Sequence, residues 1–488
     1  PPLVGKKKMG NGVFGAKTIS SSSSRCCTRL KSTKTESYSN QFSTPASSSG
    51  IMGAYEATSR GVELQARGAL NAAVAAFKEA VELHPTAERQ FRLALAYEEN
   101  GEPLLASESY EAAAKNWDGT TDVVLRHDAN LKLAHVWGHD LGNVPRGLGY
   151  LEEALAMEDF DHTIISDVTT WDQKAYFVAD EGRLEEAIKL WDGAIKGAED
   201  YLARATGGNH IDEETTERLV EMARDGRFFR AVAQRLLNGL DVESHGTAIE
   251  TELAALPPDC HYMIESWNYA KSHYPKEHLW QRPQGRFFAG THAMLTEALG
   301  LARPDGIVCE FGVFHGKSIR LLGSMVGPEN PVDGFDTFEG IPEAWGDEPA
   351  GTYTAAAEIP QRVPPNVRFH VGLFADTLPG YVASLPPELP ARFINVDCDL
   401  YQGTVEILHY LADRIGPGTV IIFDEYFMCP TWREDEYKAF QEAVEKFGWE
   451  YDYLGFSLSS KQVAVKITAS KSFVGPPAAA AAARSYIQ

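Results

Sequence analysis

The chain has 488 residues, 44% of them hydrophobic, with 45 Lys and Arg against 68 Asp and Glu and a formal net charge of −23. This length corresponds to about three domains of ordinary size, and the composition is that of folded protein. The acid excess argues against binding to nucleic acid or to anionic membranes, because both attract Lys and Arg. No stretch approaches the roughly 18 apolar residues of a membrane-spanning helix, so we expect a soluble chain.

Residues 1–52 differ from the rest in composition. The first 50 residues contain eight Lys or Arg, one acid (Glu36), many Ser and no hydrophobic period. This composition predicts either a disordered tail or an organellar transit peptide. The six cysteines show no Cys-x-x-Cys spacing, which favours a reducing compartment. We therefore expect a cytoplasmic protein, or an organellar one if the segment is a transit peptide.

Residues 55–240 show the apolar spacing of successive amphipathic helices. Four stretches align, beginning at Gly68, Gly101, Gly142 and Gly182, with a small residue five positions on, a bulky one at nine and Ala at twelve. This pattern resembles the tetratricopeptide repeat (TPR), whose period is about 34 residues; an irregular helical bundle is the alternative. Such repeats form scaffolds with a concave face, so we expect a protein partner or self-association. The histidines of this region are scattered, and each is interpreted as a core or surface residue rather than a ligand: His84, His127, His135, His139, His162 and His210.

Residues 258–468 are expected to form the next domain. After about residue 290, short β-rich runs alternate with helical patterns, which predicts a Rossmann-like, doubly wound α/β sheet. The last two of the expected strands are joined by a short polar turn and are expected to pair antiparallel at one edge. An Ala-rich tail over residues 469–488 is predicted to be disordered. The expected strands are Ile307–Phe311, Val332–Phe335, Arg368–Val371, Phe393–Val396, Val420–Phe423, Tyr451–Gly455 and Gln462–Ile467.

The first expected strand runs into a turn that carries Glu310, Gly312, Gly316 and Ser318. Glycines between a strand and a helix let a ligand approach the backbone at the helix N-terminus. Glu310 would bind a cationic amino group and repel a pyrophosphate, which favours S-adenosylmethionine (SAM) over a dinucleotide. Asp336, at the end of the second strand, is expected to accept the ribose hydroxyls.

Acidic residues also follow two later strands, as Asp397-Cys398-Asp399 and as Asp424-Glu425. The carboxyl ends of neighbouring parallel strands meet at the edge where such sheets bind ligands. Carboxylates gathered there repel one another unless a hard cation such as Mg²⁺ lies between them. The alternative is solvated loop acids that cap the following helices.

These segments together resemble the macrocin O-methyltransferase (TylF-type) family, a branch of the class I SAM-dependent methyltransferases. The matching segments are Glu310 to Ser318, Gly334 to Pro342, Gly372 to Pro379, Asp397 to Tyr401 and Phe423 to Tyr426. The resemblance implies a divalent metal, usually Mg²⁺, that polarises a sugar hydroxyl. It also implies that Asp397 is a metal ligand and the general base, and that Asp424 and Glu425 complete the metal set. Glu425 stands where many members have Asp.

The sequence thus predicts a SAM- and metal-dependent O-methyltransferase acting on a sugar or glycosylated small molecule, with TPR-like repeats before it. One alternative is a TPR scaffold whose methyltransferase-like domain is inactive; another is a nicotinamide-dependent oxidoreductase. The aromatic residues of about 260–290 would either form a lid over the acceptor or pack against the sheet. Trp345 and Trp432 are expected in loops near the acceptor pocket.

Overall fold

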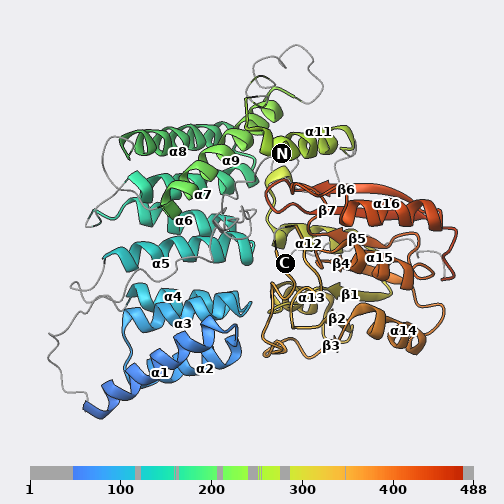
Figure 1. Ribbon diagram of the computed structural model, residues 1–488, viewed down its shortest axis with the longest axis horizontal. Coiled ribbons are helices and arrows are strands. Elements are labelled where there is room, and N and C mark those ends of the chain that lie inside the picture. The colour runs from blue at the N-terminus through green and yellow to red at the C-terminus, as the bar shows by residue number, and fades with distance from the viewer. Residues whose placement is uncertain are drawn as a thin grey trace, which may run out of the picture.

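The computed structural model describes residues 48–115, 123–158, 160, 164–205, 213–239, 251, 253, 255–274, 286–346 and 348–475. A column of helices lies beside a sheet domain (Figure 1). The predictions for residues 1–47 and 476–488 lie outside the described residues. Within the described ranges, no helix is both long enough and apolar enough to cross a bilayer.

The helical part consists of antiparallel helices in which chain neighbours pack together (Figure 1). Each of the four predicted glycines lies in a tight turn between two helices with a positive φ, between 65° and 79°, a backbone conformation that glycine adopts without a Cβ penalty. The helices are α1 (Ser48–Ala66), α2 (Leu70–Leu83), α3 (Ala87–Glu99), α4 (Pro103–Lys115), α5 (Val123–His135), the π-helical segment η1 (Val136–Asp140), α6 (Val144–Leu155), α7 (Ile164–Asp180), α8 (Leu184–Ala205) and α9 (Glu213–Leu237).

The expected repeat spacing is confirmed by burial. The bulky residue nine positions after each glycine is at most 1% exposed, and the Ala at twelve is at most 3% exposed. The small residue at five allows close helix packing, since a Cβ on Gly147 would lie 2.8 Å from the carbonyl oxygen of Ala134. The array begins earlier than residue 55, because α1 starts at Ser48.

The sheet has the order β3-β2-β1-β4-β5-β7-β6, with β7 antiparallel to both neighbours and the other pairs parallel. This confirms the Rossmann-like α/β class and the antiparallel edge pair, and two strands, β1 and β5, match their predicted bounds. The strands are β1 (Ile307–Phe311), β2 (Val332–Asp336), β3 (Val367–Val371), β4 (Ala391–Val396), β5 (Val420–Phe423), β6 (Glu450–Phe456) and β7 (Val463–Ala469).

Helices cover both faces of the sheet because strand side chains alternate between faces. Cys309 and Phe311 of β1 join a core that also contains residues of α14, α15 and α16, whereas Val308 packs with residues of α12 and α13. These helices are α12 (Thr291–Leu301), α13 (Lys317–Val326), α14 (Phe374–Ser384), α15 (Tyr401–Tyr410) and α16 (Glu436–Phe447). The domain continues past residue 468, since the Val474 amide donates to the carbonyl of Asp413 at 3.0 Å.

The described aromatic residues of 260–290 pack against the sheet. They lie in α11 (His261–Ser272), just after it at Tyr274, and in η4 (Arg286–Phe288); the short turn η3 (Pro258–Cys260) precedes α11. The Tyr269 hydroxyl lies 2.5 Å from that of Tyr453 on β6, and Trp267 is 2% exposed against Phe287. Trp432 is 1% exposed and stacks edge-on with Tyr269, so this indole belongs to the core. Trp280 lies outside the described residues.

Candidate active site

Glu310, the penultimate residue of β1, carries a fully buried carboxylate. The Ser318 hydroxyl, in the first turn of α13, donates to Oε1 of Glu310 at 2.9 Å, and Asn395 Nδ2 of β4 donates to Oε2 at 3.4 Å. Burial raises the pKa of Glu310 to about 8, with Asp336 and Asp424 adding to the effect and the two hydrogen bonds opposing it. A buried carboxyl of this kind is stabilised in its ionised form by a cationic ligand.

The two glycines of the turn are required by the backbone. Gly312 has a φ of 88°, and a Cβ there would lie 1.5 Å from the carbonyl oxygen of Asp397. Gly316 has a φ of 80° and forms the N-cap of α13. The glycine loop therefore passes directly over the end of β4, which places the predicted cofactor residues beside the predicted base.

Asp336 fastens this loop to β2. Its Oδ2 accepts the amides of Val313 and Phe314, both at 2.7 Å, and its Oδ1 accepts the amide of Phe338 at 2.7 Å. These bonds give Asp336 a positioning role that the sequence analysis missed. Each carboxylate oxygen has more than one lone pair, so the predicted role toward a ribose is compatible with this geometry and stays a prediction.

Acidic side chains gather where β4 and β5 end. Asp397 follows β4, Asp424 follows β5, and both keep part of their surface open to solvent. Burial raises the pKa of Asp397 well above its ordinary range, and Asp424 and Asp399 raise it further. For Asp424, burial and then the neighbouring Glu425 raise the pKa to about 7. The carboxylates at these two strand ends therefore repel one another.

Glu425 is placed differently from the other two predicted metal residues. Both of its carboxylate oxygens lie 3.1 Å from Lys461 Nζ, and both side chains are nearly buried. Its amide donates to Oε2 of the fully buried Glu436 at 3.1 Å. The side-chain amide nitrogen Nε2 of Gln462 donates to Oδ1 of Asp424 at 2.5 Å. Lys461, Gln462 and Glu436 were not singled out in the sequence, because they lie far along the chain from Asp397 and belong to no motif.

Asp397 and Asp424 fit a hard divalent cation in their chemistry. Their oxygens are suitable ligands for Mg²⁺, and a dication would relieve the repulsion that raises their pKa values. Glu425 fits less well, because its carboxylate already neutralises a buried ammonium. Among the described residues, the three-residue group whose ligand atoms all lie within 4.8 Å of one another is a different one, His135, His139 and Asp140.

The helical part contacts and supports the glycine loop that follows β1. Arg320 Nη1, on α13, donates to the carbonyls of His315 at 2.6 Å and Gly101 at 3.0 Å. A Cβ on Gly101, in the α3–α4 turn, would lie 2.8 Å from the carbonyl oxygen of His315. Arg362 pairs with the buried Glu102 of the same turn. No sequence pattern predicted this support, since contacts between segments 220 residues apart leave no local pattern.

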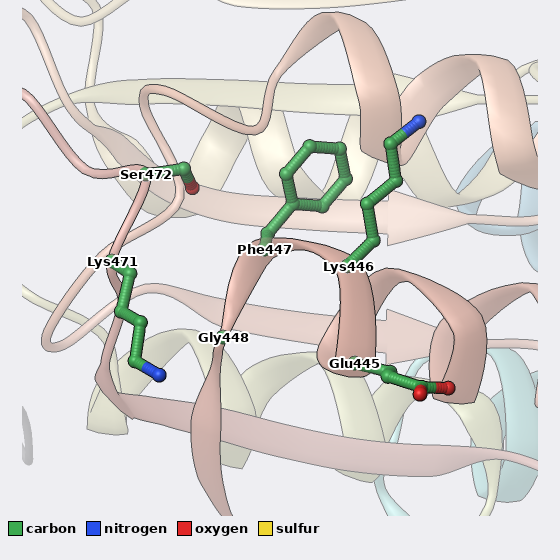
Figure 2. A pocket seen from close by; sticks show the side chains of 6 residues that line it. All are labelled: Glu445, Lys446, Phe447, Gly448, Lys471 and Ser472. Atoms are coloured by element: carbon green, nitrogen blue, oxygen red, sulfur yellow. The ribbon is translucent and has the colours of Figure 1, made fainter.

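A hollow of about 310 Å³ lies elsewhere, at the C-terminal end of α16 (Figure 2). Gly448 precedes β6 and Lys471 follows β7, so the hollow is at the edge where the parallel strands begin. The carboxyl-end residues above are at the opposite edge. The hollow is therefore separate from the candidate site.

The sheet thus has seven strands with one antiparallel strand, a glycine loop after β1, and acidic residues at the end of β2 and directly after β4 and β5. The sequence matches the family described as "Methyltransferase domain" over residues 309–426, which contains the predicted cofactor and metal residues. The TylF-type branch is not distinguished by this match.

Two curated relatives are similar to the C-terminal part. A demethyldecarbamoylnovobiocin O-methyltransferase from Streptomyces niveus is 28% identical over 212 residues, which are 36% of this chain and 78% of the relative. An 8-demethyl-8-(2,3-dimethoxy-alpha-L-rhamnosyl)-tetracenomycin-C 4′-O-methyltransferase from Streptomyces olivaceus is 33% identical over 143 residues, 25% of this chain and 53% of the relative. The chain thus spans about half the length of the second relative.

Among solved structures, YrrB, described as a TPR protein with an unusual peptide-binding site, aligns with 44% of this chain and 92% of its own at 16% identity and a TM-score of 0.32. The architecture of the two parts is established by the strand order of the sheet and by the packing of neighbouring helices, independently of this alignment.

Proposed function

We propose that the chain is a SAM- and divalent-metal-dependent O-methyltransferase that methylates a hydroxyl of a sugar or glycosylated small molecule. The observation that supports this most directly is the contact between Gly312 and the Asp397 backbone. It joins a loop suited to SAM to a group suited to accept a proton. The acceptor class is supported by the relatives, one of which is named for a rhamnosyl-bearing tetracenomycin.

In this proposal the glycine loop and Glu310 bind and orient SAM. Glu310 binds the ammonium of the methionine moiety, and Ser318 holds the Glu310 carboxylate in place. The methyl donor then lies at the carboxyl end of β1, next to β4 and its Asp397. Alignment of donor and acceptor supplies a large part of the rate enhancement of such transfers.

Asp397 takes the proton of the acceptor hydroxyl as the acceptor oxygen attacks the methyl carbon of SAM. Asp397 and Asp424 would hold the divalent cation, and Glu425 would join them only by leaving Lys461. When bound, such a cation lowers the pKa of a coordinated hydroxyl. The partly open surface of both aspartates gives an acceptor access to them.

The alternative is a TPR scaffold with an inactive methyltransferase-like domain. The joint presence of Glu310, Gly312, Asp336, Asp397 and Asp424 at one edge argues for the enzyme, because a decaying site would have lost some of them. In either case the helical repeats would bind a protein partner or a second copy of the chain.

The test measures SAM binding by calorimetry and methyl transfer by mass spectrometry on a panel of glycosylated natural products, with and without Mg²⁺. We expect Asp397→Asn and Asp424→Asn to abolish transfer while SAM binding persists. The matched control is Asp452→Asn, an exposed acid of β6, which should transfer normally. Near-normal turnover by either site variant with a chelator present would contradict the metal mechanism, and absence of SAM binding would favour the scaffold.

A further inference from the structure

A second group of metal-ligating side chains lies away from the candidate active site, where the helical part meets the sheet domain. His135 ends α5, and His139 and Asp140 belong to the π-helical segment η1. One ligand atom from each of the three lies within 4.8 Å of the others. The proposed methyltransferase reaction uses none of these residues.

The π-helical turn explains why three residues so close in sequence face one way. In an α-helix, residues i and i+4 share a face but i+5 is turned away from it. The η1 segment has i→i+5 hydrogen bonding, with the Leu141 amide donating to the carbonyl of Val136 at 2.9 Å, and this wider turn brings the side chain of i+5 back toward that of i. Asp140 therefore joins the two histidines. Such insertions are often found at functional sites.

The distances suit a small transition-metal ion. Asp140 Oδ1 lies 3.1 Å from His139 Nδ1 and 3.9 Å from His135 Nε2. Tetrahedral Zn²⁺ with bonds of about 2.0–2.2 Å requires ligand atoms about 3.3–3.6 Å apart. The two imidazoles are stacked, with centroids 4.9 Å apart and planes 13° apart. Small side-chain rotations thus bring the three ligand atoms to coordinating geometry.

The electrostatic surroundings hold the ligands in their metal-binding forms. Burial lowers the pKa of both His135 and His139, which favours the neutral imidazole that coordinates metal. Burial alone would raise the pKa of Asp140, but the Lys317 ammonium and the hydrogen bond from His139 favour its ionised form, and that pKa lies below its usual range. An ionised carboxylate and neutral imidazoles form a ligand set that favours Zn²⁺, Co²⁺ or a similar ion over Mg²⁺.

We propose that His135, His139 and Asp140 form a transition-metal site between the helical part and the methyltransferase domain. Lys317 Nζ, from the first turn of α13, lies 3.0 Å from the same Asp140 oxygen. The metal ion and the Lys317 ammonium therefore compete for Asp140. Because Lys317 directly follows Gly316 of the cofactor loop, occupation of the metal site releases one of the contacts that hold this loop to the helical part.

The experiment titrates the full-length chain, freed of any histidine tag, with Co²⁺ followed by visible absorption and with Zn²⁺ in competition with a chelating dye. All titrations use an Asp424→Asn background, which removes one of the two proposed ligands of the active-site cation and so reduces metal binding there. We expect one equivalent of metal, with the visible bands of His-ligated Co²⁺. His139→Gln and Asp140→Asn should lose this equivalent, whereas the control His409→Gln, an exposed histidine, should retain it.

Lys317→Met adds a test that does not depend on the folding of the ligand variants. Removal of the competing ammonium should tighten Zn²⁺ binding, whereas a metal bound elsewhere would be unaffected. Retention of the stoichiometric Co²⁺ spectrum by a folded His139→Gln variant would overturn the proposal. So would a Lys317→Met variant whose affinity for Zn²⁺ is unchanged or weaker.

Discussion

Glu310 shows at the scale of one residue how a fold prepares a carboxyl group for a cation. The side chain is fully buried, receives hydrogen bonds from Ser318 and Asn395, and has a pKa raised to about 8 chiefly by burial. Near pH 7 it is mostly protonated. A bound ammonium would favour the ionised form, so the proposed binding of SAM would be linked to loss of this proton.

This linkage predicts that SAM affinity rises with pH between about 6 and 7.5, by at most about tenfold per pH unit, below the ionisation of the ligand's own amino group. The sign follows from the raised pKa: below it, each binding event must expel a proton from Glu310. Calorimetry in two buffers of different ionisation enthalpy should detect the proton released on binding.

Glu310→Gln should bind SAM more weakly and with no pH dependence over the same range. The matched control Glu329→Gln changes an exposed glutamate and should keep the wild-type profile. A Glu310→Gln variant with the wild-type profile would assign the proton to another group.

Among single residues, the sequence was most informative where chemistry follows directly from the chain. Glu310, Gly312, Asp336, Asp397 and Asp424 each end or follow a short apolar run, and parallel strands bring such ends to one edge. The partners of these residues were not predictable. Lys461, for example, lies 36 residues from Glu425, and its pairing depends on how β7 enters the sheet.

At the scale of elements, three contacts hold the glycine loop that follows β1. Asp336 ties it to β2, Gly312 fits it against β4, and the α3–α4 turn supports it through Gly101 and Arg320. The first two supports belong to the sheet domain and follow motifs. The third comes from the helical part, which the sequence analysis treated as a separate scaffold.

From the third contact we predict that Gly101→Ala weakens SAM binding, although Gly101 is more than 200 residues from the glycine loop in the sequence. The added Cβ would lie 2.8 Å from the His315 carbonyl oxygen and 2.9 Å from the Lys317 amide nitrogen, at a φ of 66°. Relief of this clash must shift the loop, and a loss of about 1.4 kcal/mol would raise the dissociation constant about tenfold. Calorimetry with SAM measures the change.

Gly149→Ala is the matched control, since Gly149 lies within α6 and a Cβ there meets no atom within 4 Å. This variant should bind SAM normally and gain roughly 0.5–1 kcal/mol of stability, because Ala is the better helix former. Equal SAM affinity in the two variants would mean that the helical part does not support the loop.

At the scale of the whole molecule, the two parts share one hydrophobic core. Phe288 of η4 lies with its ring centroid 5.7 Å from that of Trp191 on α8 and 6.0 Å from that of Phe229 on α9. These side chains belong to the same buried cluster as Phe311 of β1. The sequence predicted the two architectures from their periodicities, but nothing in a periodic pattern indicates which faces of two such units pack together.

A shared core predicts that the full chain unfolds in one calorimetric transition. Phe288→Ala removes a ring that joins the two parts. It should lower the free energy of unfolding by about 3–5 kcal/mol and should also separate the transition into two.

The control Phe77→Ala deletes an equally buried ring from α2, in a cluster confined to the helical part. It should move the single transition to lower temperature without dividing it, because the contact between the two parts is unchanged. If Phe288→Ala shifted a single transition by the same amount as Phe77→Ala, the helices and the sheet would be coupled through the polar contacts of Arg320, Arg362 and Lys317 rather than through this core.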